Sequence, residues 1–191
     1  MRKLVWFIHT SLDGFAVATN KELDWAHVDE EIFEYAGDQT DQADTALYGR
    51  VTYGIMNAYW PTAGDQPNAS KHDKQHASWY KKVQKVVLSK TMQETGLPDT
   101  TIIGDNVSKE ILTLKQAPGK NIIVFGSPTV GHFLMAEDLI DDYWLFVNPI
   151  LLGEGIPVFK DIRERRKLKL LTGNIFSSGV VGVHYERVVK N

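Results

Sequence analysis

The pattern of apolar and polar positions alternates between short β-rich runs and longer amphipathic stretches over the first two thirds of the chain. Short apolar runs predict strands at residues 3–8, 44–48, 85–89, 101–104 and 121–125. Helical spacing predicts helices at residues 29–39, 51–57 and 107–116, and from the turn at 126–128 to about residue 137. Alternation of this kind predicts an α/β fold, with a mixed or parallel sheet covered by helices.

The pattern changes in the last third of the chain. Residues 143–147, 168–171 and 180–188 are expected to form strands, with no long helix between them. The last two strands, joined around Ser177-Ser178-Gly179, are expected to form an antiparallel hairpin. We therefore predict a mainly parallel sheet with an antiparallel end, in one domain that spans residues 1–191.

Irregular structure is expected between residues 57 and 75. The Trp60-Pro61 pair is expected to end the helix at 51–57, because proline removes a backbone donor and clashes with the preceding turn. Residues 62–75 are polar and include glycine, proline and asparagine. The pattern there predicts a long surface loop.

The composition excludes several kinds of chemistry. The chain has 191 residues, of which 43% are hydrophobic and 24% charged, and this suits one folded domain. It has no cysteine, so a disulfide framework, a thiol nucleophile and a thiolate metal site are excluded. His72 and His76 are four residues apart, but no third ligand is fixed beside them, so no metal site is expected.

The net charge and the length of the apolar runs indicate whether the chain binds nucleic acid or a membrane. The chain has 21 Lys and Arg against 24 Asp and Glu, a net charge of −3 that gives no general attraction to polyanions. Its apolar runs are far shorter than the ~20 residues of a membrane-spanning helix. The first residues show no apolar segment followed by a small-residue cleavage site. We therefore expect a cytoplasmic protein with no nucleic-acid and no membrane partner.

Three strand ends are candidate anion sites. In two of them a buried strand ends at a glycine, Gly49 or Gly126, and a helix follows at once. Unpaired amide groups and the positive helix end converge at such a junction, and glycine allows a phosphate to approach the backbone. Further donors at these junctions are Arg50, Thr52, Ser127 and Thr129. The alternative is that both are ordinary turns in which serine and threonine cap a helix. The third candidate, Ser89-Lys90, ends the strand at 85–89.

Carboxylates near the first loop are the candidates for proton transfer. Four of them cluster around the aromatic residues Phe15 and Trp25, namely Asp13, Asp24, Asp29 and Glu30. A carboxyl group beside a tryptophan can have its pKa raised by desolvation and then supply a proton near neutral pH. The alternative is a helix cap or first-turn charge, a role that Asp29 fits well.

Several short motifs of the chain occur together in one known family. They are Ser11-Leu12-Asp13-Gly14-Phe15, Gly49-Arg50-Val51-Thr52-Tyr53, Leu88-Ser89-Lys90-Thr91, Ile123-Val124-Phe125-Gly126, and Asp141-Asp142 followed by Asn148-Pro149-Ile150-Leu151-Leu152-Gly153-Glu154-Gly155. By their order and spacing, the chain resembles the dihydrofolate-reductase-like superfamily over essentially its whole length. Within it, the chain is most similar to the C-terminal reductase domain of RibD, the bifunctional riboflavin-biosynthesis deaminase–reductase, in a stand-alone form.

The resemblance implies a three-layer α/β/α fold around a mixed sheet of about eight strands, with NADPH lying across the carboxyl edge of the sheet. The cofactor-binding residues that it implies are His9, Ala16, Gly49, Arg50, Thr52, Ser89, Lys90, Gly126, Ser127, Pro128 and Thr129. Ser89 and Lys90 would contact the 2′-phosphate, and the turn at 126–129 would hold the pyrophosphate. The family commonly has Gly-Gly at that turn, whereas Ser127 follows Gly126 here, and its side chain restricts the backbone.

The resemblance also implies where the substrate and the proton donor lie. The substrate would stack beside the nicotinamide, between the first loop and the first helix. The expected substrate contacts are Ser11, Trp25, Gly153 and Gly155, and the expected catalytic residues are Glu30 and Asp13. Asp29 stays open as the alternative to its neighbour Glu30.

The paired anion sites and the resemblance together lead us to expect an NADPH-dependent oxidoreductase that transfers a hydride to a small heterocyclic substrate. The substrate that the resemblance implies is 5-amino-6-(5-phosphoribosylamino)uracil of riboflavin biosynthesis. A dihydrofolate or pterin reductase, and a non-catalytic NADP-binding protein, stay open as alternatives. Exposed strand edges and the apolar strands near the end of the chain also favour a homodimer.

Overall fold

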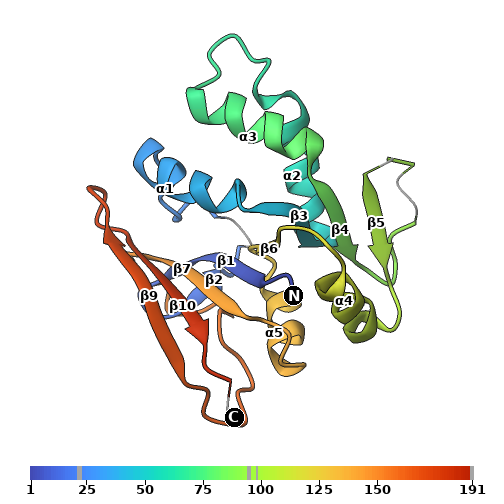
Figure 1. Ribbon diagram of the computed structural model, residues 1–191. Helices are drawn as coiled ribbons and strands as arrows, with labels where there is room; N and C mark the ends of the chain where they lie inside the picture. Colours follow the sequence, from blue (N-terminus) through green and yellow to red (C-terminus); the bar gives the residue numbers. More distant parts are fainter. Residues whose placement is uncertain (21–22, 94–95, 98, 190–191) are drawn as a thin grey trace.

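The computed structural model describes residues 1–20, 23–93, 96–97 and 99–189, and at its centre is an eight-stranded mixed sheet (Figure 1). The strands of this sheet are β1 (Leu4–Ser11), β3 (Ala43–Gly49), β4 (Gln84–Leu88), β5 (Thr100–Ile103), β6 (Asn121–Phe125), β7 (Asp142–Asn148), β9 (Leu168–Ile175) and β10 (Val181–Arg187). Their order across the sheet is β5-β4-β3-β6-β1-β7-β10-β9. The first six pair in parallel, and β10 pairs antiparallel with both β7 and β9. The predicted mainly parallel sheet with an antiparallel hairpin is confirmed.

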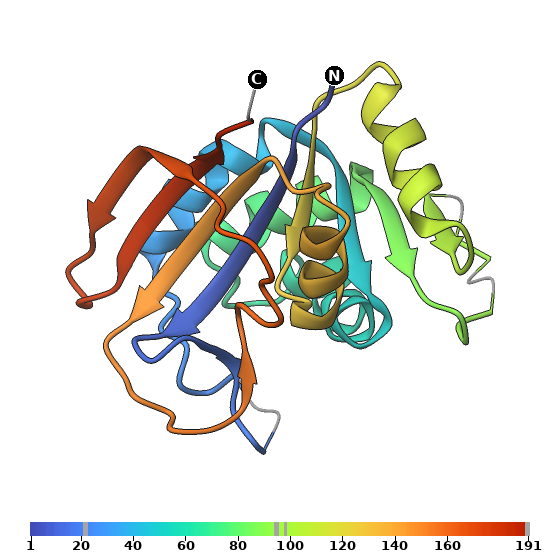
Figure 2. The same ribbon diagram turned by 90° about the horizontal axis from the view of Figure 1, so that it is seen from below.

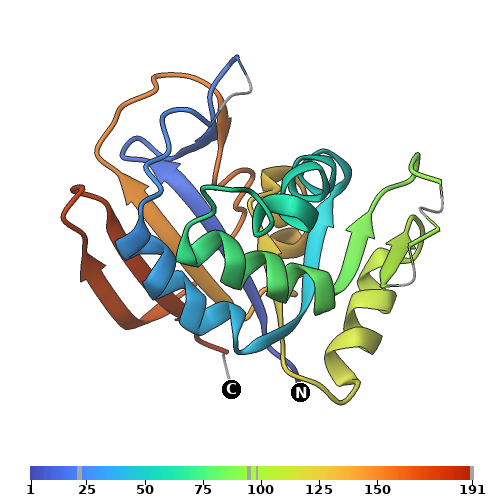
Figure 3. The same cartoon turned by 90° about the horizontal axis from the view of Figure 1, so that it is seen from above.

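Helices cover both faces of the sheet, as Figures 2 and 3 show from opposite sides. The helices on one face are α1 (Glu30–Thr40), α2 (Arg50–Ala63) and α3 (Lys71–Lys82), and those on the other are α4 (Val107–Gln116) and α5 (Pro128–Ala136). The predicted three-layer α/β/α arrangement is therefore confirmed. No helix among the described residues is both long and apolar enough to cross a membrane.

The alternation of side chains along β1 divides the core into two parts. Leu4, Trp6 and Ile8 point to the α4 and α5 face and belong to the larger buried cluster. Val5 and Phe7 point to the opposite face, where they pack against the cluster that contains residues of α1. Both faces are buried because helices cover both, and this is why the central strands read as nearly continuous apolar runs.

The region between residues 57 and 82 differs from the prediction. α2 continues through Pro61 to Ala63, so the expected end at the Trp60-Pro61 pair is wrong. Pro61 cannot donate to the carbonyl of Asn57, and the helix ends two residues after it. α3 begins inside the expected loop at 62–75 and continues beyond it to Lys82. Ser70 and Asp73 start that helix with a reciprocal capping box. Its buried face is made of His76, Ala77 and Tyr80, so it lacked the aliphatic pattern that predicts a helix.

A small two-stranded sheet, which was not predicted, lies beyond the carboxyl ends of β1 and β7 (Figure 2). It pairs β2 (Phe15–Val17) with β8 (Ile156–Pro157). The chain enters β8 through Gly155, whose φ is +147°. A Cβ at that position would lie 2.1 Å from the carbonyl oxygen of Val17, so only glycine allows the two loops to approach this closely.

Candidate active site

The carboxyl edge of the sheet brings the predicted cofactor residues together. The parallel strands β4, β3, β6, β1 and β7 are consecutive in the sheet and end at the same edge. The residues that follow these strands therefore lie in the order Ser89-Lys90, Gly49-Arg50, Gly126-Ser127, the loop after Ser11, and the loop after Asn148. Ligands of open α/β sheets bind at this edge, so the topology agrees with the predicted location of the site.

The N-termini of α2 and α5 lie side by side, because their preceding strands β3 and β6 are neighbours. The backbone N–H of Gly49 donates a hydrogen bond of 3.0 Å to the hydroxyl oxygen of Ser127. No side chain caps either helix, which contradicts the alternative in which Ser127 is an ordinary cap of α5. Two uncapped helix ends at one place fit an anionic group with several oxygens, such as a pyrophosphate.

β1 fixes the turn that precedes α5. The indole N–H of Trp6 donates to the carbonyl oxygen of Gly126 at 2.8 Å, and the N–H of Gly126 donates to the carbonyl oxygen of Phe7 at 2.8 Å. Gly126 and Ser127 both have left-handed backbones, with φ of +51° and +48°. This conformation costs a serine about 1–2 kcal/mol more than a glycine, so Ser127 stores strain in the turn.

Gly131 explains why Trp6 can reach the turn. The glycine lies in α5 directly against the indole, and a Cβ there would lie 2.0 Å from a ring carbon of Trp6. Because Trp6 is fully buried, its ring has no room to move aside. Sequence reasoning missed both residues, since a tryptophan within an apolar run and a glycine within a helix carry no local signal of this contact.

Ser89 and Lys90 lie at the end of β4, next to the Gly49 junction. The Ser89 hydroxyl accepts hydrogen bonds from the N–H groups of Thr91 and Met92, at 3.2 and 3.0 Å. This leaves its O–H proton available to a ligand. Lys90 is exposed, and so is Arg50 at the start of α2. Cationic and hydroxyl groups thus lie on the β4 and β3 side of the edge.

Asp13 joins the first loop to the loop after β7. Its carboxylate accepts from the Ser11 hydroxyl at 2.6 Å, and from the backbone N–H groups of Leu152 and Gly153 at 3.1 and 2.7 Å. The Ser11 hydroxyl and then these amide groups lower the pKa of Asp13 from its usual value. The raised pKa expected for a carboxyl group in this cluster is therefore wrong for Asp13. Two expected substrate contacts, Ser11 and Gly153, are both engaged in this junction.

The start of α1 separates the roles of Asp29 and Glu30. Asp29 caps the helix, since its carboxylate accepts from the N–H of Ile32 at 2.9 Å. Glu30 is exposed and makes no hydrogen bond or ion pair with the described residues. Trp25 is partly buried, and its indole N–H is sealed from solvent without a partner. Of the two adjacent carboxylates, Glu30 is the one that is free for a ligand.

Asn148, at the end of β7, connects three segments of the site and was not predicted. Its side-chain oxygen accepts from the N–H of His27 at 2.8 Å, and its amide nitrogen donates to the carbonyl oxygens of Phe146 and Thr10 at 3.0 and 3.3 Å. The amide nitrogen also lies 3.4 Å from Nδ1 of His9. An asparagine at a strand end was the only available signal.

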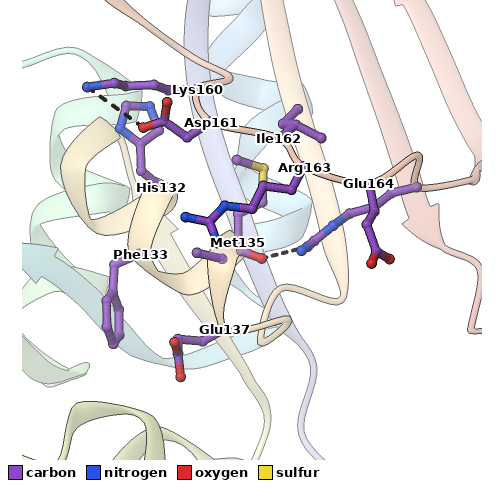
Figure 4. A pocket seen from close by; sticks show the side chains of 11 residues that line it. His132, Phe133, Met135, Glu137, Lys160, Asp161, Ile162, Arg163 and Glu164 are labelled. Atoms are coloured by element: carbon purple, nitrogen blue, oxygen red, sulfur yellow. Dashed lines mark hydrogen bonds and ion pairs between the residues drawn. The ribbon is translucent and has the colours of Figure 1, made fainter.

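Two hollows in the surface lie away from this edge. One, of about 640 Å³, lies between α5 and the segment before β9 (Figure 4). Several of its polar groups pair within the protein, because Arg166 donates to the carbonyl oxygen of Met135 and His132 contacts that of Pro157. The other, of about 720 Å³, lies between α1 and α3. Neither is lined by a predicted site residue.

His72 and His76 belong to an aromatic cluster beside the second hollow. His72 stacks on Phe33 with ring centroids 3.4 Å apart, and His76 lies 4.1 Å from the ring centroid of Trp60. Burial lowers the pKa of His76 to about 3. Among the described residues, no group of three or more histidine or acidic side chains is placed to hold a metal ion. The two histidines thus pack as neutral rings.

Known structures share this fold. A pyrimidine reductase-like protein of Corynebacterium diphtheriae superposes with a TM-score of 0.70 at 14% identity, covering 99% of this chain and 93% of that one. Dihydrofolate reductase from Enterococcus faecalis, in complex with NADP(H), superposes with a TM-score of 0.63 at 13% identity, covering 97% and 96%. The diaminohydroxyphosphoribosylaminopyrimidine deaminase/5-amino-6-(5-phosphoribosylamino)uracil reductase of Thermotoga maritima superposes with a TM-score of 0.68 at 14% identity. The match covers 98% of this chain and 57% of that one.

Two proteins of Bacillus subtilis (strain 168) are similar in sequence over nearly their whole length. The uncharacterised protein YyaP is 33% identical over 190 residues, which cover 96% of this chain and 94% of YyaP. The uncharacterised protein YwjB is 30% identical over 198 residues, which cover 97% and 98%. The family model described as the RibD C-terminal domain matches residues 2–181. The chain therefore belongs to the RibD C-terminal domain family.

Proposed function

We propose that the protein is an NADPH-dependent reductase that transfers a hydride to a small heterocycle. The observation that carries this proposal is the pair of adjacent, uncapped helix N-termini after Gly49 and Gly126. A dinucleotide is the ligand that suits them, because both helix ends favour negative charge and its pyrophosphate supplies several acceptors. Membership of a family of reductase domains supports the same conclusion.

Different residues at this edge bind different parts of the cofactor. When bound, the nicotinamide supplies the hydride, which no side chain of the chain can supply. Arg50 and Thr52 at the start of α2, with the turn of Gly126, Ser127, Pro128 and Thr129, hold the phosphates. Ser89 and Lys90 hold the 2′-phosphate and so select NADPH over NADH. His9 and Ala16 lie toward the nicotinamide end.

The β1 and β7 side of the edge binds the substrate. Asp13 holds the first loop against the loop of Leu152 and Gly153, and so shapes the wall of the site. Glu30 holds or passes the proton that accompanies the hydride, since it has no protein partner among the described residues. Asp29 is committed to capping α1. We therefore expect Glu30→Gln to reduce turnover more than Asp29→Asn does.

The favoured substrate is 5-amino-6-(5-phosphoribosylamino)uracil, because the family is that of the RibD C-terminal domain and a structural neighbour is named for this reduction. A dihydrofolate or pterin is the second candidate, because a dihydrofolate reductase shares the fold. The third candidate is an NADP-binding protein without catalysis, for which the strained Ser127 turn is the motivating feature.

Cofactor titration followed by turnover tests the proposal. Protein fluorescence and thermal shift should show NADPH binding that is weaker for NADH, and Arg50→Ala should weaken it about tenfold. Arg163→Ala, an exposed arginine in the hollow of Figure 4, is the control and should change nothing. NADPH absorbance should then fall with the ribosylaminopyrimidine. A fall only with dihydrofolate selects the second candidate, binding without any turnover selects the third, and no binding rejects the proposal.

We further propose that the protein is a homodimer that uses the edge strand β9. All eight residues of β9 are exposed, and they include Leu170 and Ile175, which are 54% and 83% exposed. Native sheets usually protect such an edge, and a second copy would cover it. Light scattering should give twice the monomer mass for the wild type and the monomer mass for Leu170→Lys. A monomeric wild type rejects the dimer.

A further inference from the structure

His9 lies near the carboxyl end of β1, on the sheet face that α1 covers. Its ring stacks on Phe146 of β7, with ring centroids 5.0 Å apart and an interplanar angle of 19°. The ring of Phe7 lies 6.2 Å away at an angle of 64°. Phe146 itself is buried in the cluster that contains Ile32 of α1. Packing therefore fixes the plane of the imidazole on the side where the substrate is expected.

The side chain of Asn148 lies against one ring nitrogen of His9. Its side-chain oxygen accepts from the N–H of His27, and this fixes the orientation of the amide. The amide nitrogen consequently donates to the carbonyl oxygens of Phe146 and Thr10. The same nitrogen lies 3.4 Å from Nδ1 of His9. The amide has two protons for these three acceptors, and an amide nitrogen does not accept, so its contact with Nδ1 is compatible with an unprotonated Nδ1 and with the ring proton on Nε2.

Nε2 of His9 is free to meet a ligand. It has no hydrogen-bond partner among the described residues, and unlike Nε2 of His72 and His76 it is not sealed from solvent. Burial of the ring lowers the pKa of His9 to about 4, because the charged imidazolium is desolvated. The ring is therefore neutral near neutral pH and offers one N–H donor at the end of β1.

We propose that His9 is a substrate-contacting residue whose Nε2–H donates a hydrogen bond to a ring oxygen or nitrogen of the heterocycle, with Asn148 as the residue that holds this tautomer. The proposal rests on the proposed function and adds a determinant of substrate choice. A heterocycle with an acceptor at this place, such as a pyrimidine carbonyl, satisfies the donor. An analogue without one leaves a partly buried N–H unpaired and is rejected.

Two variants separate the ring of His9 from its donor. His9→Phe keeps a flat ring against Phe146 and removes the N–H, whereas His9→Gln removes the ring and places an amide N–H near the position of Nε2. With saturating NADPH and 5-amino-6-(5-phosphoribosylamino)uracil or dihydrofolate as substrate, kcat/KM should fall about 10–100-fold for His9→Phe and less than about fivefold for His9→Gln. NADPH affinity should fall far less than kcat/KM in both, because the proposed phosphate contacts lie at the ends of β3, β4 and β6 and not at His9. Equal losses in the two variants, or a loss confined to NADPH affinity, overturn the proposal.

A second measurement does not depend on turnover. Nitrogen-15 NMR of the histidine rings should show His9 as the Nε2–H tautomer, with its signals assigned by their absence in His9→Phe. Addition of 5,6-diaminouracil to the NADPH-bound protein should shift the Nε2 signal. The Nδ1–H tautomer, or no shift, overturns the contact. If the shift is seen but no substrate is reduced, the contact stands and the proposed reductase function fails. If reduction proceeds unchanged in His9→Phe, the function stands and the contact fails.

Discussion

The two halves of the carboxyl edge of the sheet are held together in different ways. At β3, β4 and β6, short strand-to-helix junctions place backbone amide groups, and neighbouring turns support one another through the Gly49–Ser127 and Trp6–Gly126 hydrogen bonds. At β1 and β7, longer loops are joined by the side chains of Asp13 and Asn148. We refer to these as the cofactor half and the substrate half.

The two halves should therefore respond differently to mutation. In the cofactor half the proposed phosphate site combines backbone amide groups with the side chains of Arg50 and Lys90, so both a displaced backbone and a lost side chain should weaken NADPH binding. In the substrate half, single polar side chains determine how the loops meet. Truncating one of them should alter substrate handling while the cofactor half stays intact. Three predictions test this contrast.

The largest effect is expected from Gly131→Ala in α5. The new Cβ would lie 2.0 Å from the ring of Trp6, and this buried ring also holds the turn of Gly126. We expect the free energy of unfolding to fall by about 3 kcal/mol, measured by urea denaturation, and NADPH affinity to fall about tenfold. Gly37→Ala in α1 is the control, because a Cβ there meets nothing within 4 Å. It should stabilise the protein by about 0.5–1 kcal/mol. Similar stability of the two variants would contradict the role of Trp6.

An intermediate effect is expected from Asp13→Ala. Loss of the carboxylate frees the N–H groups of Leu152 and Gly153, and the two loops separate. We expect kcat/KM for the heterocycle to fall about 10–100-fold, because misplaced substrate contacts slow the reaction, while the Kd of NADPH changes less than about twofold. Asp24→Ala removes the same charge from an exposed residue without a partner among those described. A comparable loss in Asp24→Ala, or weaker NADPH binding in Asp13→Ala, would remove the distinction between the halves.

The smallest effect is expected at Ser127. Ser127→Gly relieves about 1 kcal/mol of left-handed strain but loses the hydrogen bond from Gly49, which is worth about the same, so the Kd of NADPH should stay within about twofold. Ser127→Ala keeps the strain and loses this hydrogen bond, and the Kd should rise about fivefold. Isothermal calorimetry would measure both. If the alanine variant binds as the wild type does, the hydroxyl of Ser127 does not support the junction.

The cofactor half could be predicted from the sequence because its signals are local. A glycine between a buried strand and a helix marks the junctions at Gly49 and Gly126, and parallel topology then places them together. The αL conformation of Ser127 and its bond to Gly49 could not be predicted, because they depend on two turns that are distant in the chain.

Much of the substrate half could not be predicted. Asp13 looked like a proton donor because its neighbours in the sequence are aromatic, whereas its partners Leu152 and Gly153 come from a loop about 140 residues away. Asn148 had no feature that indicated its contact with His27. The same limit applies to α3, whose buried residues are largely aromatic and polar and whose capping box lies in a stretch that resembled a loop.

The hydrogen bond between Gly49 and Ser127 also restricts how the protein can change over evolution. It joins segments that are 78 residues apart in the chain, at the ends of two neighbouring strands. Inserting one residue into either strand end would shift that helix start by about 3 Å and separate the two turns. The two junctions are therefore inherited as a pair. A chimaera that exchanges only one of them with a relative would keep both sequence motifs and lose the site that they form together.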